Sequence, residues 1–307
     1  MKPFGIAIHG GAGTILPQLL TLEKEVAYLA ALSAAITIGQ SILSKGGTSI
    51  DAVEAAVISL EDCPLFNAGK GAVFNAAGEH EMDAAIMSGI DRACGAVAAV
   101  QGVQNPVSLA KAVMLKTEHV LLIGKGAEAF AKAQGFEQKE DDYFFDKFRH
   151  DQWIQAKAED TIQLDHSSEK KFGTVGAVAL DTYGNLAAAT STGGMTNKKY
   201  GRVGDTPIIG AGTYASNETC AISCTGHGEF FMKQLVAYDV ACLMEYSGLS
   251  LDDACEKVVN QKLKKVGGEG GLIAIDTAGN ICLSFNSTGM YRASAKNNEA
   301  ACIKIFQ

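Results

Sequence analysis

Thr174 is the residue of this chain whose setting best suits nucleophilic chemistry. It follows a polar stretch that ends in Gly173, and it precedes residues with the alternation of a strand. Taken alone, a threonine at the start of a strand indicates only β propensity. If the chain is cut before it, however, Thr174 gains a free α-amine, whose ordinary pKa is about 7.7–8.0. Such an amine can serve as a base near neutral pH and activate the hydroxyl of its own residue.

Histidine-based catalysis has weaker support in this sequence. The six histidines are scattered, at positions 9, 80, 119, 150, 166 and 227, and neither H-E-x-x-H nor G-x-S-x-G occurs. A zinc hydrolase or a Ser-His-Asp hydrolase would need such a local signature. His9 closes an apolar strand, so we expect a hydrogen-bonded core residue there and not a base. An N-terminal threonine needs no histidine.

A glycine-rich segment indicates a different class of function. Residues 120–129 read as a strand, then G-x-G-x-x-A, then a helix, which is the pattern of a dinucleotide-binding turn. The acidic residue that should end a second strand is missing, because Asp141, Asp142 and Asp146 lie in or before a predicted helix. A helix start is therefore the preferred interpretation. A nicotinamide-dependent oxidoreductase and a catalytically silent binding protein remain the alternatives from other classes.

The first half of the chain must position these groups with strands and helices. Residues 4–9 alternate like a strand and run into a glycine turn at 10–13. Residues 160–173 are polar and mixed in charge, which predicts a linker. We expect helices at 22–45, 49–62, 106–117, 125–134 and 144–159, a loop at 65–71, and strands near 72–75, 81–88 and 94–102.

The second half of the chain begins a new pattern at Thr174. A strand, a tight turn and a strand occupy 175–190, and the same order recurs at 272–285. Helices are expected at 228–247 and 250–264, and a last strand at 300–306. This order of elements predicts sheets paired in the middle with helices outside.

The composition favours a globular protein with a small partner. Of the 307 residues 47% are hydrophobic, which excludes intrinsic disorder. The net charge of −8, without basic blocks, argues against binding to nucleic acid or to an anionic membrane. The eight cysteines form no C-x-x-C pair and are expected to be reduced. No signal peptide is recognisable, and the charge-free stretch 26–44 is interpreted as a buried helix, so we expect a cytoplasmic protein.

Six runs of residues carry a specific pattern. They are HGGAG at 9–13, FNAGKGAVFN at 66–75, GTVGAVALD at 173–181, TSTGGM at 190–195, GRVGDTPIIGAGTYA at 201–215 and SCTGHGE at 223–229. Together they resemble the plant-type asparaginase/isoaspartyl peptidase family of N-terminal-nucleophile (Ntn) hydrolases. The resemblance spans nearly the whole chain, in the family's order.

The resemblance implies a four-layer αββα sandwich of the Ntn-hydrolase type, made as a precursor that cuts itself between Gly173 and Thr174. The products would be an α subunit, 1–173, that ends in a flexible linker at about 160–173, and a β subunit, 174–307. They would form one joint domain and assemble as an (αβ)₂ dimer. The implied activity is hydrolysis of isoaspartyl (β-aspartyl) dipeptides and L-asparagine to release L-aspartate, with no cofactor for catalysis.

The resemblance also assigns catalytic groups by position. Thr174 would be the nucleophile and, through its amine, the base. Thr192 would support that hydroxyl, and Asn67 would help to align it. Thr225 and the N–H of Gly226 would form the oxyanion hole, which stabilises the charge that develops during attack.

Contacts to the substrate and to an ion follow in the same way. Arg202 would hold the α-carboxylate with the bidentate geometry of a guanidinium, and Asp205 would hold the α-ammonium, with the carbonyl of Gly228 completing that site. His227 stands where a smaller residue is expected, so the pocket polarity should differ. A structural sodium ion would bind the main-chain carbonyls of Leu60, Glu61, Cys63, Phe66, Ala68 and Lys70.

Two rival activities lie within the same family. A glycosylasparaginase-like amidase would need a signal peptide, and a threonine aspartase carries longer insertions, for which 307 residues leave little room. The sequence does not rank L-asparagine against isoaspartyl dipeptides.

Overall fold

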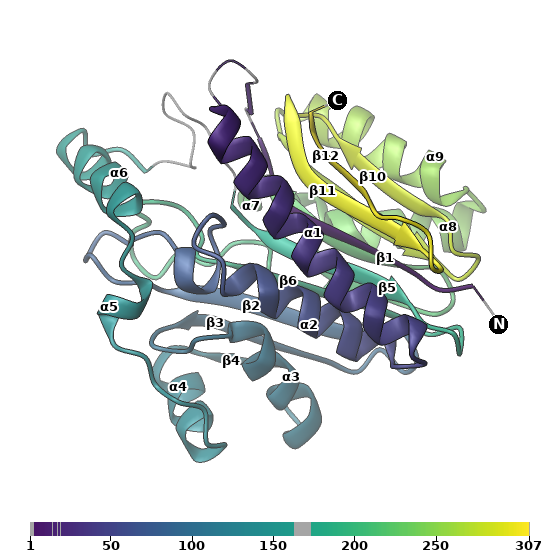
Figure 1. Ribbon diagram of the computed structural model, residues 1–307, viewed down its shortest axis with the longest axis horizontal. Coiled ribbons are helices and arrows are strands. Elements are labelled where there is room, and N and C mark those ends of the chain that lie inside the picture. Colours follow the sequence, from purple (N-terminus) through teal and green to yellow (C-terminus); the bar gives the residue numbers. More distant parts are fainter. Residues whose placement is uncertain (1–2, 14, 17, 19, 163–172, 307) are drawn as a thin grey trace.

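Two stacked β-sheets form the centre of the molecule (Figure 1). The computed structural model describes residues 3–13, 15, 16, 18, 20–162 and 173–306. The larger sheet has the strand order β12 (Cys302–Phe306), β11 (Gly289–Lys296), β1 (Gly5–Gly13), β5 (Val175–Leu180), β6 (Leu186–Thr192), β2 (Met82–Ser88), β3 (Cys94–Val100), β4 (Leu121–Ile123). The smaller sheet has the order β10 (Ile281–Phe285), β9 (Gly270–Asp276), β8 (Cys220–Gly226), β7 (Thr213–Ala215).

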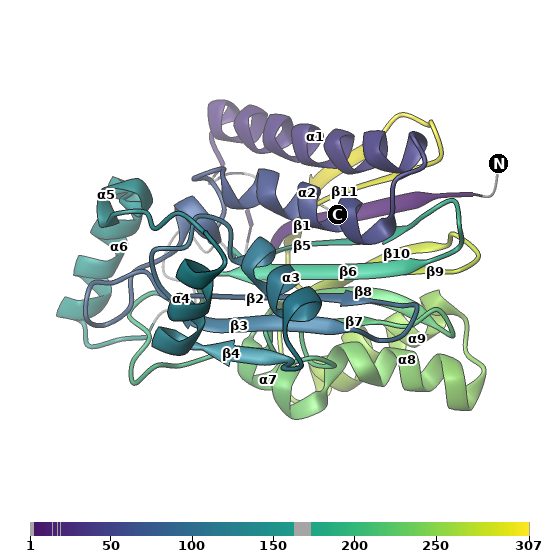
Figure 2. The ribbon, with the colours of Figure 1, turned by 90° about the horizontal axis from the view of Figure 1, so that it is seen from below.

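Helices cover the outer faces of both sheets. The first half of the chain supplies α1 (Leu22–Ser44), α2 (Ser49–Glu61), α3 (Pro106–Lys116), α4 (Gly124–Ala133), α5 (Asp141–Phe144) and α6 (Lys147–Ala158). The second half supplies α7 (Gly228–Gln234), α8 (Val236–Ser247) and α9 (Leu251–Glu256). Figure 2 shows α1 and α2 on one side of the stacked sheets and α8 and α9 on the other. The predicted αββα sandwich is confirmed.

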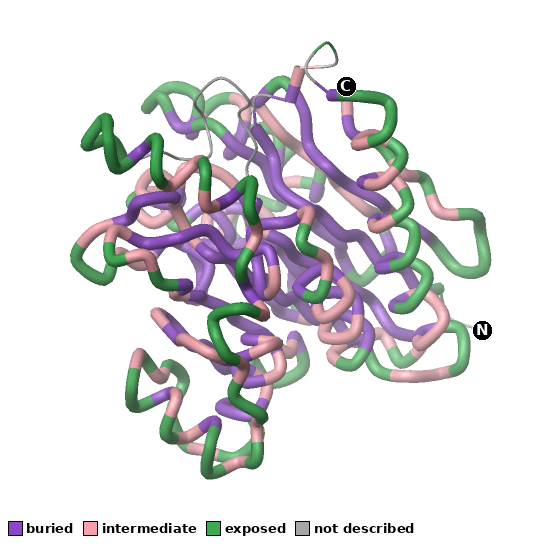
Figure 3. The backbone as a smooth tube through the Cα atoms, turned by 60° about the vertical axis from the view of Figure 1, so that its left-hand side comes forward, coloured by how far each residue is buried: buried purple, intermediate pink, exposed green. Residues whose placement is uncertain are grey.

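Alternate residues of the central strands enter two different cores. On β1, Ile6 and Ile8 belong to the core beneath α1 and α2, whereas Ala7 belongs to the core between the sheets. On β5, Ala177 and Val178 divide in the same way. Since successive side chains of a strand point to opposite faces, both faces of the larger sheet are buried. Figure 3 shows these strands buried along most of their length, with exposed residues on the outer helices.

The pairing of β5 with β6 brings distant residues together at one end of the larger sheet. The two strands are antiparallel, and Val175 lies opposite Ser191. The residue that precedes β5, Thr174, is therefore next to the residue that ends β6, Thr192. The two threonines are 18 positions apart in the sequence, and the residues between them form a hairpin, as the sequence predicts from the turn at 181–185.

The predicted glycine turn at 10–13 is wrong, because β1 continues through these residues to Gly13. A β-bulge between His9 and Ala12 shifts the register against β11. Gly10 is packed so tightly that a Cβ atom there would lie 2.3 Å from the ring of Phe66. The glycines therefore allow a strand to pass close to a neighbouring loop, where a turn is predicted.

Other boundaries also differ from prediction. Residues 72–75 form no strand, and they follow a short 3₁₀ helix, Gly69–Gly71. The predicted helix 228–247 is broken at Leu235, which adopts φ 48°, and α9 continues as a π-helix over Lys257–Leu263. The strands β7, β8 and β11 are missing from the predicted elements. Most of the predicted linker, 163–172, lies outside the described residues.

The helix α1 is long and apolar enough to cross a membrane by length and composition alone. In this fold it packs along α2, β1 and β11, with Leu32, Ile36 and Leu43 buried. Val26 and Ile38 on its other side are exposed. The prediction of a buried helix therefore holds for one face only.

The glycine-rich segment 120–129 forms the predicted strand and helix, β4 and α4. Among the strands that the structure describes, β4 forms the one parallel pair, with β3. It lies at the edge of the sheet, and Ile123 is 63% exposed. Because dinucleotide sites lie at the ends of buried parallel strands, this edge does not provide one.

Candidate active site

The hydroxyl of Thr174 meets that of Thr192 at the start of β5. Thr174 Oγ1 donates to Thr192 Oγ1 at 3.2 Å, and the N–H of Gly194 donates to the same Thr192 oxygen at 3.0 Å. Thr192 is buried, whereas Thr174 is half-buried and lines a pocket. The predicted nucleophile thus has a fixed hydrogen-bond partner on the neighbouring strand.

His9 lies beneath the main chain of Thr174. Its Nδ1 is 3.1 Å from the carbonyl oxygen of Thr174, and its Nε2 is 2.9 Å from the hydroxyl of Ser223. Complete burial lowers the pKa of His9 to about 3, so the ring is neutral. Because a carbonyl only accepts, Nδ1 carries the proton and Nε2 accepts from Ser223. The predicted hydrogen-bonded core histidine is confirmed.

A buried row of hydroxyls continues from Ser223, and none of its members was predicted as a site residue. Thr190 Oγ1 is 2.7 Å from Ser223 Oγ, and Thr213 Oγ1 donates to Thr190 at 2.7 Å. Thr213 Oγ1 also lies 3.1 Å from the carbonyl oxygen of Thr206, a pocket residue. This row connects His9 to the wall of the pocket. Its only signal in the sequence was the presence of hydroxyl residues within largely apolar runs.

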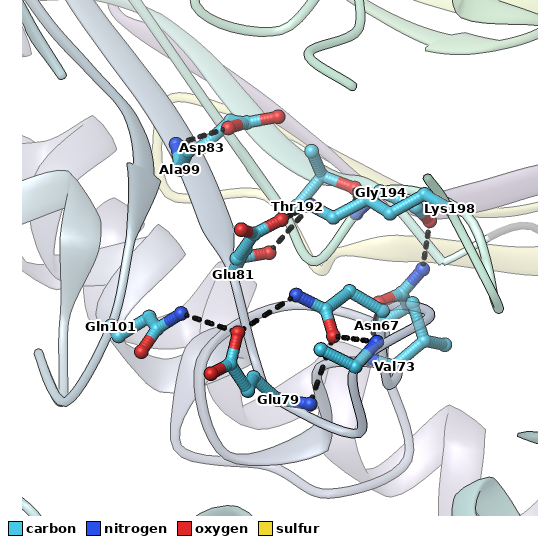
Figure 4. Close-up of polar contacts among 12 residues, drawn as sticks. Asn67, Val73, Glu79, Glu81, Asp83, Ala99, Gln101, Thr192, Gly194 and Lys198 are labelled. Atoms are coloured by element: carbon cyan, nitrogen blue, oxygen red, sulfur yellow. Dashed lines mark hydrogen bonds and ion pairs between the residues drawn. The ribbon is translucent and has the colours of Figure 1, made fainter. Parts of the chain in front are cut away.

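Asn67 holds the turn that follows Thr192 and also contacts Gly173. Its Nδ2 donates to the carbonyl of Gly194 at 2.7 Å, and its Oδ1 accepts from the N–H of Val73 at 3.0 Å (Figure 4). A Cβ atom at Gly173 would lie 1.8 Å from Cβ of Asn67. The residue before Thr174 therefore has to be glycine in this packing.

Arg202 and Asp205 converge over Gly228 at the N-terminus of α7. A Cβ atom at Gly228 would lie 2.7 Å from Arg202 Nη2 and 3.0 Å from Asp205 Oδ1. Arg202 Nε donates to Glu229 Oε1 at 2.8 Å, which orients the guanidinium. A cationic and an anionic group thus border one small space.

Asp205 is buried, and its Oδ2 atom has no hydrogen-bond partner within the described residues. Burial raises the pKa of this carboxyl to about 7. An unpaired carboxylate in such a place is costly, and a bound cation would relieve the cost. His227 precedes Gly228 at the start of α7, near Glu229 and Arg202, and burial lowers the pKa of its ring.

The pocket at these residues is small, at about 30 Å³, which is room for a water or two. It is lined by the predicted residues Asn67, Gly173, Thr174, Thr192, Arg202, Asp205, Gly226 and Gly228. It is also lined by Gly194, Met195, Gly204 and Thr206, which belong to the quoted runs but were not predicted to act.

Thr225 is the predicted site residue that does not line the pocket. It is buried on β8, and its Oγ1 accepts from the N–H of Ala12 at 3.3 Å. Since a hydroxyl also has a proton to donate, this contact leaves its predicted oxyanion role open. Gly226 does line the pocket. The role of Thr225 stays a prediction.

The predicted sodium loop is compact and rich in carbonyl oxygens. The carbonyls of Cys63, Phe66 and Ala68 each accept one main-chain N–H within the loop. A Cβ at Gly71 would lie 2.1 Å from the oxygen of Phe66 and 2.6 Å from that of Pro64, so these carbonyls gather closely. Each carbonyl has a second lone pair, and neutral oxygens suit a hard cation. The loop therefore fits the predicted ion, which stays a prediction.

Side chains could also bind a metal ion, as distinct from the main-chain carbonyls of the loop. Across the part of the chain that the structure describes, no group of three or more His, Cys, Asp or Glu residues is arranged to hold a metal ion. All eight cysteines are free thiols.

Comparison with known proteins places this geometry in a family. A family model described as asparaginase matches residues 1–305. The chain is 54% identical over 293 residues to an isoaspartyl peptidase of Salmonella typhimurium, which covers 94% of each chain. It is 42% identical over 299 residues to an isoaspartyl peptidase/L-asparaginase of Xenopus laevis, and 39% identical over 330 residues to a probable isoaspartyl peptidase/L-asparaginase 2 of Arabidopsis thaliana. These two alignments cover 97% and 100% of this chain and 94% and 100% of the relatives. The chain therefore belongs to the asparaginase family of hydrolases.

Proposed function

We propose that this protein is an N-terminal threonine hydrolase that cleaves isoaspartyl dipeptides and L-asparagine and releases L-aspartate. The observation that carries the proposal is the convergence of Arg202 Nη2 and Asp205 Oδ1 over Gly228, in the pocket that also contains Thr174. The relatives named above are isoaspartyl peptidases and asparaginases. We extend that activity to this chain.

Recognition depends on the two charged groups of a free amino-acid head. Arg202 would bind the α-carboxylate through its Nη atoms, because Nε is held by Glu229. The buried Oδ2 of Asp205 would accept from the α-ammonium, with help from the carbonyl of Gly228. Pairing with the ammonium would lower the pKa of Asp205 from its unliganded value of about 7.

Attack would then occur at the side-chain carbonyl of the aspartyl group. The free amine of Thr174 takes the proton of its own hydroxyl, and Oγ1 bonds to the carbonyl carbon. The N–H of Gly226 and the hydroxyl of Thr225 would stabilise the oxyanion. Collapse expels the leaving amine, which takes the proton back, and leaves an ester on Thr174. Water hydrolyses that ester, with the same amine as base.

Maturation would use the same hydroxyl in the precursor. Thr174 Oγ1 attacks the carbonyl carbon of Gly173, the peptide bond becomes an ester, and water releases residues 1–173 from residues 174–307. Contact of Gly173 with Asn67 and its place in the pocket wall support this step. Because Gly173 lines the pocket, cleavage would also free it to leave the pocket wall.

The remaining properties are proposals from the same family membership. We propose an (αβ)₂ assembly, a structural sodium ion held by the carbonyls of residues 60–70, a cytoplasmic address, and catalysis without a cofactor, nucleic acid or membrane.

Intact mass and substrate turnover test the proposal together. Incubation of the wild-type chain should yield two chains, 1–173 and 174–307, and release of aspartate from β-Asp-Leu. Thr174→Ala should remain one folded, inactive chain. Turnover by the Thr174→Ala variant, or a stable single chain of wild type without activity, would refute the proposal.

A further inference from the structure

A lysine side chain is completely buried behind the turn that follows Thr192. The Lys198 side chain has 0% exposure, although it carries an ammonium. Its Nζ donates to the main-chain oxygen of Glu81 at 2.8 Å and lies 3.8 Å from Oε2 of the same residue (Figure 4). Lysine is almost never fully buried unless it is paired. The position therefore calls for a reason.

A second buried charge lies next to it on β2. Asp83 is fully buried and pairs in register with Thr192 on β6. Its Oδ1 accepts from the N–H of Ala99 at 2.8 Å, and Oδ2 has no hydrogen-bond partner within the described residues. Burial lowers the pKa of Lys198, while Asp83 and Glu81 oppose that effect. The lysine thus offsets part of the charge of the two carboxylates.

Lys198 connects to the nucleophile through two contacts. A Cβ at Gly194 would lie 3.0 Å from Lys198 Nζ and 3.1 Å from its Cδ, so the lysine stem packs under that residue. The N–H of Gly194 donates to Thr192 Oγ1, which accepts from Thr174. The turn that orients the nucleophile therefore rests on the lysine side chain.

A role in packing alone would not require the charge. Methionine has nearly the same length and shape, and burying an ammonium costs free energy that a thioether does not. A cation near the start of β5 has an electrostatic effect, because it favours the neutral form of the Thr174 amine, which is the form that acts as base. Arg202 acts on the amine in the same sense as Lys198. The carboxylates of Asp205, Asp83 and Glu81 act against both cations, and His9 is neutral.

We propose that Lys198 is a positioning residue for Thr174: its stem supports the turn from Thr192 to Gly194, and its ammonium offsets the charges of Asp83 and Glu81, which would otherwise favour the protonated form of the free amine of Thr174. The inference rests on the proposed function, because the amine exists only after cleavage before Thr174.

The test compares two pairs of matured proteins with β-Asp-Leu as substrate: wild type with Lys198→Met, and Asp83→Asn with Asp83→Asn/Lys198→Met. The kcat profile against pH is the main readout, because it reports groups in the substrate complex, where Asp205 is paired with the ammonium. In each pair, loss of the lysine charge should shift the acidic limb of the kcat profile to higher pH, by about half a pH unit or more. We also expect a roughly tenfold or greater loss in kcat with KM changed by less than about twofold.

Control variants separate charge from packing. Lys198→Arg should keep the limb of wild type, because it keeps the charge. Lys199→Met is the matched control, since Lys199 is the next residue and pairs at the surface with Asp160; it should change neither kcat nor the limb. If the single variant Lys198→Met fails to fold, the comparison of Asp83→Asn with Asp83→Asn/Lys198→Met decides the question. That double variant buries neither the Lys198 charge nor the Asp83 charge.

If the acidic limb of the kcat profile lies at the same pH with and without Lys198, the inference is overturned, even where kcat is reduced. Lys198 would then have a packing role only. A wild-type protein that does not cleave β-Asp-Leu would refute the proposed function and the inference with it. Activity in wild type with an unmoved limb refutes the inference alone.

Discussion

Gly173 packs so closely against Asn67 that no side chain fits between the two residues. A Cβ at Gly173 would lie 1.8 Å from Cβ of Asn67 and 2.8 Å from its main-chain nitrogen. Asn67 is itself fixed, because its side chain bonds to Gly194 and Val73 and its carbonyl accepts from Gly193. The bond before Thr174 is therefore held against a rigid loop.

The first prediction follows from this contact. Gly173→Ala should fold but mature at least roughly tenfold more slowly, because the new methyl group displaces the carbonyl that Thr174 attacks. The fraction of cut chain over time, read from intact mass, measures it. Gly126→Ala is the control, since no heavy atom lies within 4 Å of a Cβ there. Cleavage of Gly173→Ala at the wild-type rate would contradict the proposed geometry.

The second prediction concerns Arg202. Arg202→Ala removes charge-assisted hydrogen bonds to the substrate carboxylate and should weaken transition-state binding by at least about 2–3 kcal/mol. Steady-state kinetics on L-asparagine measure the loss in kcat/KM. Maturation should be largely spared, because the precursor has no free substrate carboxylate to bind. Arg92→Ala, at an exposed ion pair with Glu218, should change neither. An unchanged kcat/KM for Arg202→Ala would disprove the assignment.

The third prediction is a pH dependence that arises from Asp205. Its pKa of about 7 in the unliganded protein lies above the ordinary 3.8, because the carboxyl is buried. The carboxyl must be ionised to hold the ammonium, so kcat/KM should fall as the pH decreases through about 7. Asp205→Asn should lower kcat/KM and remove this ionisation from the profile. A profile that is flat from pH 8 to about 6 in wild type would count against the role.

The same shift makes a prediction for stability. The folded protein holds a proton on Asp205 between about pH 4 and 7, where the unfolded chain has lost it. Without ligand, the contribution of this group to the free energy of unfolding should therefore decrease as the pH rises through that window. The free energies of unfolding of wild type and Asp205→Asn, measured with denaturant, should differ by an amount that changes with pH. A constant difference would mean that the pKa is not raised.

The fifth prediction is selectivity for the β-linkage. Arg202 and Asp205 would fix the α-carboxylate and α-ammonium, so only the side-chain carbonyl reaches Thr174. A normal α-aspartyl dipeptide has no free α-carboxylate, and misplacement of its carbonyl by about 1 Å costs on the order of 100-fold in rate. Rates on β-Asp-Leu and α-Asp-Leu measure the ratio, and comparable turnover would refute the pocket. Glutamine should also fail, because its extra methylene moves the amide past the nucleophile.

The amino-acid sequence by itself determined many of the local elements and the place of Thr174 at the start of a strand. Helical spacing predicted α1 and α2, and the tight turn at 181–185 predicted the hairpin of β5 and β6. That hairpin places Thr174 next to Thr192, since antiparallel strands joined by a short turn have one register. The place of His9 in the core was also predicted, because it follows an alternating apolar run.

The tertiary structure alone decided which polar groups surround Thr174. Ser223 meets His9 across 214 residues of sequence, and Lys198 meets Glu81 across 117. The glycine run after His9 reads as a turn, yet packing against Phe66 and pairing with β11 make it a strand. Periodicity and turn chemistry report only on neighbours along the chain. Buried charges and hydroxyls acquire their partners when the sheets stack, so their roles could not be read from the sequence.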